Sequence, residues 1–260
     1  MSGRFLSAVF RVFAGLALVT APVFWFAPVS LAADRPSDPA EQALFDAVNH
    51  ERGTLGLRPL QWDTALANAA RLHTTLLASH DELSHRFNGE ADLQTRLRLA
   101  GARFSLVAEN VAQAPQVTML HVAWMNSAPH RANILDPQLD SIGIAVERRG
   151  DELYATQDFS ASVAQVSREQ QEQLVARLLQ SQGVAPSVSE DARRSCDANL
   201  PSYGGPVTIL RFETSDLNRL PNDLARLVSG GRFRRAALAA CEAPAPGPFV
   251  RFRFAVLLYP

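Results

Sequence analysis

The sequence contains no lysine: all 25 of its basic residues are arginine, and 26 Asp and Glu residues balance them. Without lysine the chain cannot form a Schiff base between a lysine amine and a carbonyl substrate. The formal net charge is only −1, whereas a dedicated nucleic-acid-binding protein carries a basic stripe. We therefore expect no nucleic acid among its partners. A composition of 47% hydrophobic and 20% charged residues is typical of a globular protein.

Several catalytic motifs are also absent. The sequence has no His-Glu-x-x-His pair, no Gly-x-Ser-x-Gly elbow and no glycine-rich phosphate loop. Its histidines are confined to the N-terminal half, at His50, His73, His80, His85, His121 and His130. Any metal or acid–base chemistry that uses imidazole must therefore be sought in that half.

Charge is distributed unevenly along the chain. Residues 39–160 hold 10 Arg against 15 Asp and Glu, whereas residues 161–260 hold 12 Arg against 9. The C-terminal part thus carries an excess of positive charge, which would attract an anionic polymer or membrane surface.

The N-terminus has the pattern of a targeting segment. Arg4 and Arg11 precede a run, residues 12–33, that contains no charge. Ser30-Leu31-Ala32 offers the small residues of a signal-peptidase site, so we expect residues 1–33 to be a signal peptide that is cleaved near Ala32. The protein would then be secreted or periplasmic. The uncharged run is also long enough to span a bilayer, so an uncleaved anchor over residues 12–33 is the alternative.

Cysteine is scarce, with only Cys196 and Cys241 present. In an oxidising compartment an even pair favours a disulfide, which would close a loop worth about 3–4 kcal/mol. Two buried thiols are the alternative.

The N-terminal half reads as helices followed by a β-hairpin, which predicts an α+β domain over residues 39–162. Asp38-Pro39 and Asp63 are helix-start signals. The predicted helices cover residues 39–53, 64–79, 92–100, 117–126 and 129–135, and the predicted hairpin strands cover 141–147 and 153–159.

The remaining residues, 163–260, predict a small α+β module with the element order α-β-α-β-β. We expect helices over 167–182 and 216–227 and strands over 206–213, 232–241 and 249–259. No motif in this part indicates a function.

Three side chains of the N-terminal half could carry chemistry: His85, Glu109 and His130. Two neutral imidazoles can bind Zn²⁺, but a tight site normally needs a third protein ligand. Glu109 could be that ligand, or it could orient one of the imidazoles. Alternatively, Glu109 accepts backbone hydrogen bonds at a helix start and the residues only shape a wall. We interpret His73 as a packed histidine.

A larger set of residues carries a resemblance to a known family. In chain order they are Asn49, Arg52, Gly56-Leu57, Pro59-Leu60, Trp62-Asp63, Leu66-Ala67, Ala70, His73, Leu83-Ser84-His85, Glu109-Asn110-Val111-Ala112, Trp124-Met125, Ser127, His130-Arg131, Asn133-Ile134-Leu135, Ile142-Gly143-Ile144, Tyr154 and Thr156-Gln157-Asp158-Phe159. Together they resemble the CAP superfamily (cysteine-rich secretory proteins, antigen 5 and pathogenesis-related proteins; the SCP domain) in its bacterial, cysteine-poor form.

The resemblance implies an α-β-α sandwich with a cavity that is lined by two histidines and two acidic residues, and that in some members holds a divalent metal such as zinc. His85 resembles the first histidine, Glu109 the first acid and His130 the second histidine. Ser127 stands where the other acid is expected, which would weaken a metal site at His85 and His130.

Three functions follow from these expectations. The first is an exported, non-catalytic protein that binds a small lipophilic ligand (a lipid or a sterol-like molecule), or an envelope or extracellular protein, in the cavity of His85, Glu109, Ser127 and His130. The second is a metal-dependent, peptidase-like hydrolase with His85 and His130 on the metal and Glu109 as base. The third is a cell-envelope structural protein that docks through its arginine-rich C-terminal module.

Overall fold

The computed structural model describes residues 35–197, 208–242, 247 and 249–260. The expected signal peptide or anchor, residues 1–33, therefore lies outside the described residues. Among the helices that are described, none has the length and the apolar character needed to cross a membrane.

The first sheet has four strands in the order β1-β3-β4-β2. Its strands are β1 (Gln61–Trp62), β2 (Phe104–Ala114), β3 (Ser141–Arg149) and β4 (Glu152–Ser162). As expected, β3 and β4 form an antiparallel hairpin, and Gly150 adopts a positive φ of 58° in its turn. β2 pairs antiparallel with β4 and forms one edge of the sheet, whereas β1 pairs parallel with β3.

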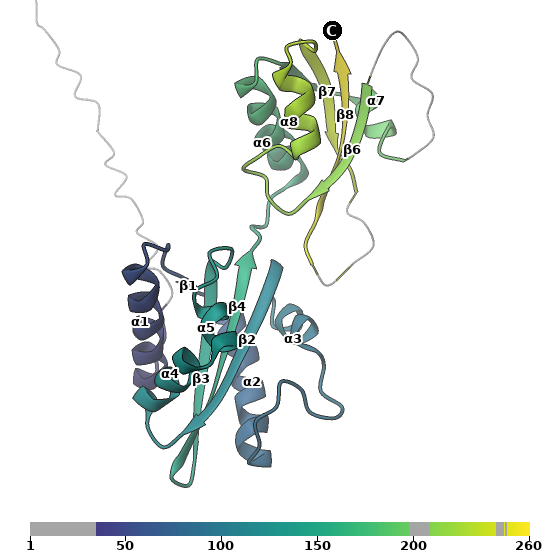
Figure 1. Ribbon diagram of the computed structural model, residues 1–260. Helices are drawn as coiled ribbons and strands as arrows, with labels where there is room; N and C mark the ends of the chain where they lie inside the picture. The colour runs from purple at the N-terminus through teal and green to yellow at the C-terminus, as the bar shows by residue number, and fades with distance from the viewer. Residues whose placement is uncertain (1–34, 198–207, 243–246, 248) are drawn as a thin grey trace, which may run out of the picture. The chain divides into compact units, whose positions relative to one another are not determined.

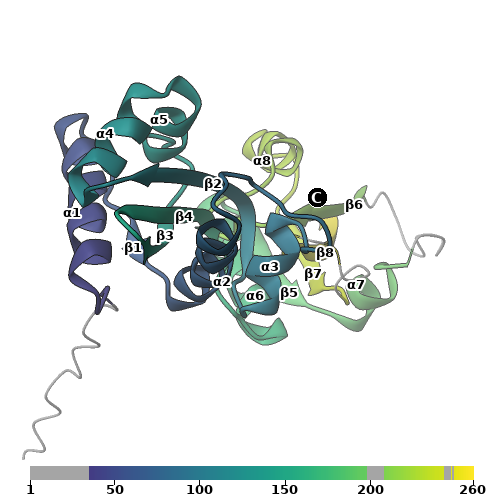
Figure 2. The same ribbon diagram turned by 90° about the horizontal axis from the view of Figure 1, so that it is seen from below.

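Helices cover both faces of this sheet, which gives the expected α-β-α sandwich (Figures 1 and 2). α2 (Thr64–His80) and α3 (Leu93–Leu99) lie on one face. On the other face α1 (Pro39–Thr54), α4 (Val117–Asn126) and α5 (Ala128–Ile134) pack into a shared apolar core. The predicted helices in this half are confirmed to within one or two residues.

Two aspartates start the longest helices of this half. The side chain of Asp38 accepts hydrogen bonds from the N–H groups of Ala40 and Glu41, and α1 begins directly after it. Asp63 caps α2 in the same way. Each carboxylate satisfies amide groups that have no partner within the helix, so the cap signals in the sequence predict the helix starts correctly.

Gly143 on β3 sets the close approach of α2 to the sheet. A Cβ atom at this position would lie 2.0 Å from the Ala67 nitrogen and 2.3 Å from the Leu66 carbonyl carbon, both in the backbone of α2. Only glycine leaves room for this helix. The contact fixes α2, and with it His73, over the middle of the sheet.

Arg52 at the end of α1 fixes the opposite layer. Its buried guanidinium donates hydrogen bonds to the carbonyl oxygens of Arg58, Ile134, Asp136 and Leu139. Ile134 is the last residue of α5, so Arg52 holds the end of the short helix that carries His130.

β2 departs from the sequence expectation. Glu109 does not start a helix, because it lies in the middle of an 11-residue strand. The sequence of β2 lacks the usual alternation of apolar and polar residues at Glu109 and Asn110. Both residues are buried, and each has polar partners on its own side of the sheet. The alternative in which Glu109 caps a helix is therefore wrong.

The second sheet has the order β5-β7-β8-β6 and contains two elements that were not predicted. Its strands are β5 (Ala185–Val188), β6 (Thr208–Thr214), β7 (Arg235–Ala240) and β8 (Phe252–Tyr259). α6 (Arg168–Ser181) and α8 (Asn222–Ser229) pack into one apolar core with β7 and β8. β5 and α7 (Glu190–Arg194) are too short for a periodic pattern, and the predicted helix over 216–227 begins only at Asn222.

The two cysteines form the expected disulfide. Cys196 follows α7 and Cys241 follows β7, and their Cα atoms lie 5.6 Å apart. Both pack against Ala255 of β8. The alternative of two buried thiols is therefore wrong.

Candidate functional site

Neighbouring residues of β2 point to opposite faces of the first sheet. Glu109 faces α2 and α3, where it meets Arg96 of α3. Asn110 faces α5, where its side chain accepts a hydrogen bond of 2.9 Å from Asn133. This alternation is the ordinary geometry of a strand, and it divides the candidate site residues between two faces.

The carboxylate of Glu109 is occupied by two partners. The Nδ1–H of His85 donates to its Oε1 over 2.9 Å, and a guanidinium N–H of Arg96 donates to its Oε2. The side chain of Glu109 is only 4% exposed, whereas that of His85 is 60% exposed. Glu109 thus lies under His85 and orients the ring, whose accessible surface faces outward.

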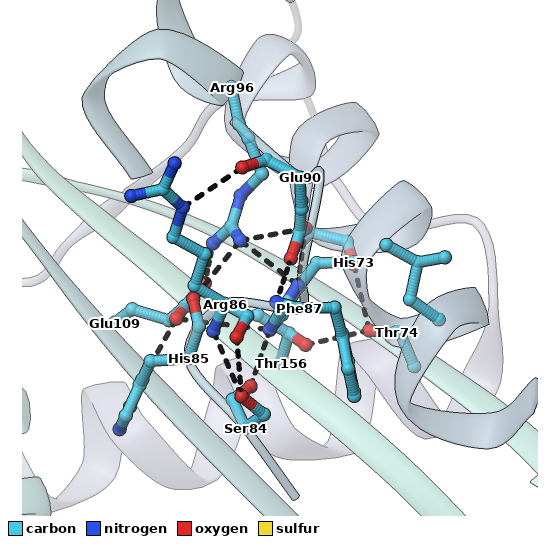
Figure 3. A network of polar contacts seen from close by, with 12 residues as sticks. His73, Thr74, Ser84, His85, Arg86, Phe87, Glu90, Arg96, Glu109 and Thr156 are labelled. Carbon is cyan, nitrogen blue, oxygen red and sulfur yellow. Dashed lines mark hydrogen bonds and ion pairs between the residues drawn. The ribbon is translucent and has the colours of Figure 1, made fainter. Parts of the chain in front are cut away.

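A second carboxylate, Glu90, extends this network into the loop between α2 and α3 (Figure 3). Arg96 donates to Oε1 of Glu90 over 2.8 Å and to the carbonyl oxygen of His85. Oε2 of Glu90 accepts a hydrogen bond from the N–H of Phe87. Arg96 therefore holds both the loop and the carboxylate beneath His85.

His73 of α2 completes the buried side of the network. Its Nε2–H donates to the carbonyl oxygen of Ser84 over 2.8 Å, and its Nδ1 lies 2.7 Å from Oε1 of Glu90. The side chain is fully buried. His73 is a packed histidine that supports the His85 loop, as the sequence predicts.

The network shifts the titration of the groups in it. The hydrogen bond to Glu109 raises the pKa of His85 above its ordinary value, although burial and Arg96 oppose the rise. Burial alone would raise the pKa of Glu90, but hydrogen bonds from Phe87 and His73 and the charge of Arg96 hold it below its usual range. His85 therefore keeps a proton to higher pH than an isolated histidine does.

Asp158 of β4 is a site residue that sequence reasoning missed. It pairs directly with Glu109 across the β2–β4 ladder. It is fully buried, and among the described residues neither of its carboxyl oxygens has a hydrogen-bond partner. Burial, with the facing charge of Glu109, raises the pKa of Asp158 well above its usual value. The available signal for Asp158 was an acidic residue in a strand, between two neighbours that are buried.

The His130 ring makes no hydrogen bond or ion pair with the network around Glu109 in the described part of the chain. It lies in the first turns of α5, where its carbonyl oxygen accepts a hydrogen bond of 3.1 Å from the Asn110 side chain. Burial, with the nearby charge of His85, lowers the pKa of His130. His85 and His130 thus form a pair of unlike imidazoles, one biased toward the charged form and one toward the neutral form.

Ser127 links α4 to α5 and is half-buried. Its backbone N–H donates to the carbonyl oxygen of Trp124 at the end of α4, and its side chain makes no capping hydrogen bond at the start of α5. Two other carboxyl groups interact with the network of Glu109: Glu90 shares Arg96 with it, and Asp158 has its pKa raised in part by Glu109. Neither of them stands at the position of Ser127.

The residues present do not fit a tight zinc site. Within the described ranges, no three His, Cys, Asp or Glu side chains gather in a geometry that could hold a metal ion. Glu109 is already engaged by His85 and Arg96, and a metal would have to displace a guanidinium from it. Structural and catalytic zinc sites normally use three or four protein ligands, and here only two imidazoles remain.

Comparison with known proteins identifies the domain that carries this site. Residues 45–159 match the model of the cysteine-rich secretory protein family. The uncharacterized protein YkwD of Bacillus subtilis (strain 168) is 30% identical over 111 residues, which are 42% of this chain and 43% of YkwD. The uncharacterized membrane protein YlbC of the same organism is 28% identical over 46% of this chain and 34% of YlbC.

A solved structure also matches part of the chain. An extracellular protein with an SCP domain from Bacillus anthracis is 27% identical, with a TM-score of 0.42 over 49% of this chain and 45% of that one. The chain thus spans less than half the length of these relatives. The family match falls on the first sheet and its helices, which hold His85, Glu109 and His130. This chain therefore carries, over residues 45–159, an α+β domain of the cysteine-rich secretory protein (CAP) family.

Proposed function

We propose that this chain is an exported CAP-domain protein that binds a small lipophilic ligand, a lipid or sterol-like molecule, at the edge of β2, without catalysing a reaction on it. Support for export comes from the targeting pattern of residues 1–33 and from a relative that is described as extracellular. His85 and His130 are the residues that would meet the ligand.

One observation carries the proposal: both oxygens of Glu109 are engaged, one by His85 and one by Arg96. A general base needs a free carboxylate oxygen within reach of its proton. Glu109 would have to leave a buried guanidinium to act as such a base, so we do not propose the hydrolase mechanism. Its role is to hold the His85 ring and its charge in place.

The surroundings of His85 suit the polar head of an amphipathic molecule. A raised pKa favours the charged form of the ring, and hydrogen bonds to charged groups contribute more than neutral ones, about 1.5–3 kcal/mol. Two residues earlier in the same loop, the side chain of Leu83 is exposed and offers an apolar surface. A ligand with a carboxylate head and an apolar tail would use both.

Equilibrium binding to residues 33–260 tests this proposal, because these residues form one compact unit. A fluorescent fatty acid and a labelled sterol serve as probes. We expect His85→Ala to weaken fatty-acid binding by about 10-fold or more, from the loss of one charge-assisted hydrogen bond. The matched control is His50→Ala, which removes an exposed imidazole from α1.

The pH dependence adds a second readout. Fatty-acid binding should weaken as pH rises through the raised pKa of His85, because the neutral ring loses its charge-assisted bond. Equal affinities of the His85→Ala and His50→Ala variants would contradict the proposal. If neither probe binds the unaltered protein, the ligand is not lipophilic, and a protein partner becomes the occupant to test.

A further inference from the structure

Three exposed arginines gather where β7 begins. Arg232, Arg234 and Arg235 follow the end of α8 within six residues. The guanidinium of Arg232 lies over the Phe233 ring, and that of Arg235 lies over the Tyr259 ring. Among the described residues, no carboxylate forms an ion pair with any of these three side chains.

Other arginines in the same part of the chain do have carboxylate partners. Arg194, Arg219 and Arg226 each pair with an aspartate three residues earlier in the sequence. Arg193 pairs with Glu172. In those cases a neighbouring carboxylate offsets the positive charge, whereas no side-chain carboxylate among the described residues pairs with the arginines at the start of β7.

The acidic residues of this part lie toward the other end of the second sheet. They are Glu169, Glu172, Glu190, Asp191, Asp197, Glu213, Asp216, Asp223 and Glu242. Each sits near the start of α6 or α8, or near the strand ends that pair with the end of β7 and the start of β8. The stretches 198–207 and 243–246 contain no charged residue. Of the acidic side chains in residues 161–260, none therefore lies at the end that holds the three arginines.

The same end contains an exposed apolar residue. α8 ends at Ser229, and in its last turn the side chain of Leu227 is 37% exposed. Figure 1 shows the end of α8, the start of β7 and the end of β8 close to the label that marks the C-terminus. A basic end that also carries an exposed leucine suits a surface of anionic headgroups over an apolar layer.

We propose that Arg232, Arg234 and Arg235 form a docking surface for anionic phospholipid headgroups, with Leu227 at its margin. Phosphate is the natural partner of a guanidinium, which can donate two parallel hydrogen bonds to it. The surface acts independently of the site at His85. It would hold the exported protein against a membrane without a spanning segment.

These arginines can also stabilise the fold, so the test must separate a loss of stability from a loss of binding. α6 and α8 both end on this side of the second sheet, and positive charge near a helix C-terminus stabilises the helix. An alanine variant could therefore lose stability as well as binding. A variant with lysine at all three positions keeps the charge at the helix ends and at the surface.

Vesicle sedimentation with residues 33–260 tests the proposal. The vesicles consist of phosphatidylcholine with or without phosphatidylglycerol, at low and at high salt. A basic residue near an anionic bilayer contributes about fivefold in affinity, so replacing all three arginines with alanine should weaken binding to phosphatidylglycerol vesicles by about 100-fold. Changing all three arginines to lysine should restore most of it, and high salt should weaken the binding of the unaltered protein.

The control removes the same charge from the acidic end. Arg168, Arg194 and Arg219 are exposed, and their joint replacement by alanine should leave vesicle binding within about threefold, because their distance from the bilayer screens them. Equal losses in the two alanine variants would overturn the proposal. Equal binding to vesicles without phosphatidylglycerol would overturn it as well. Binding to soluble polyphosphate but not to vesicles would identify a soluble polyanion and also reject the lipid surface.

Discussion

Glu109 on β2 and Asp158 on β4 stand directly opposite each other in an antiparallel ladder, so two carboxyl groups share one buried position. Directly opposed residues have their Cβ atoms about 5 Å apart on the same face of a sheet. Two ionised carboxylates at that distance would repel strongly in a buried environment. Arg96 and His85 engage Glu109, and the pKa of Asp158 is raised, which favours the protonated form of Asp158.

The first prediction concerns Asp158→Asn, which replaces a neutral carboxyl group with an isosteric amide. An acid whose pKa is raised by folding binds its proton more tightly in the folded state. The free energy of unfolding of the unaltered protein should therefore fall as pH rises above about 4, the ordinary pKa of an aspartate. Each pKa unit of the rise costs about 1.4 kcal/mol.

The asparagine variant lacks this loss, because it cannot ionise. Urea denaturation at several pH values should show that the free energy of unfolding of the variant, relative to that of the unaltered protein, increases between about pH 4 and neutral pH. A difference in free energy that stays constant over this range would contradict the raised pKa.

Arg96 is predicted to be the most costly side chain of the site to remove. Arg96→Leu leaves Glu90 and Glu109 buried without their cation, and breaking a buried ion pair from one side costs about 3–5 kcal/mol. The matched control is Arg98→Ala, on the same helix but exposed, which should cost less than about 1 kcal/mol. Urea denaturation measures both, and equal costs would show that Arg96 does not hold the network.

The titration of His85 should depend on Glu109. Because the hydrogen bond from His85 to Glu109 is the largest cause of its raised pKa, Glu109→Gln should lower the pKa of His85 toward about 6.5. The titration can be followed by NMR of the ring protons. Glu82→Gln changes an exposed acid in the same loop and should leave the pKa of His85 where it was.

The same contact has a predictable effect on stability. Since folding raises the pKa of His85, the stabilisation is present below about pH 6.5 and is lost as pH rises through the raised value. His85→Ala should therefore cost more at acidic than at alkaline pH. The cost should stay below about 1 kcal/mol because the ring is largely exposed. If the substitution cost more at alkaline than at acidic pH, the result would contradict the raised pKa of His85 in the folded protein.

A substitution at Gly143 tests the packing of α2 on the sheet, which positions His73. Gly143→Ala would put a Cβ atom within 2.0 Å of the α2 backbone, so the helix must move, and we expect a loss of more than about 3 kcal/mol. Gly53→Ala is the control, because its Cβ would meet nothing within 4 Å and the residue lies in α1. That substitution should stabilise the protein by about 0.5–1 kcal/mol. Thermal denaturation distinguishes the two.

Local chemistry made much of the fold predictable from the sequence. Asp38 and Asp63 start α1 and α2 because a carboxylate caps free amides, and branched residues at alternate positions mark the β3–β4 hairpin. The disulfide followed from an even number of cysteines. β2 was missed because its centre is polar on both faces, and only tertiary partners make that pattern stable.

The site was predictable only in part, for the same reason. The family resemblance brought out His85, Glu109 and His130, and the structure joins the first two directly. Arg96 and Glu90 carry no local signal, since an arginine in a short amphipathic helix usually points to solvent. Their roles depend on tertiary contacts that bring α3 and the loop between α2 and α3 to Glu109 on β2, which no sequence periodicity encodes.

The central claim is that Glu109 and Arg96 fix His85 as a donor to a ligand and do not complete a metal site. A calorimetric titration of residues 33–260 with zinc at neutral pH tests this claim most directly, with His85→Ala and His130→Ala as variants. We predict weak binding that is far from one tight equivalent, because only two imidazoles are free to act as ligands. One equivalent bound with nanomolar affinity, and lost in both variants, would contradict the account.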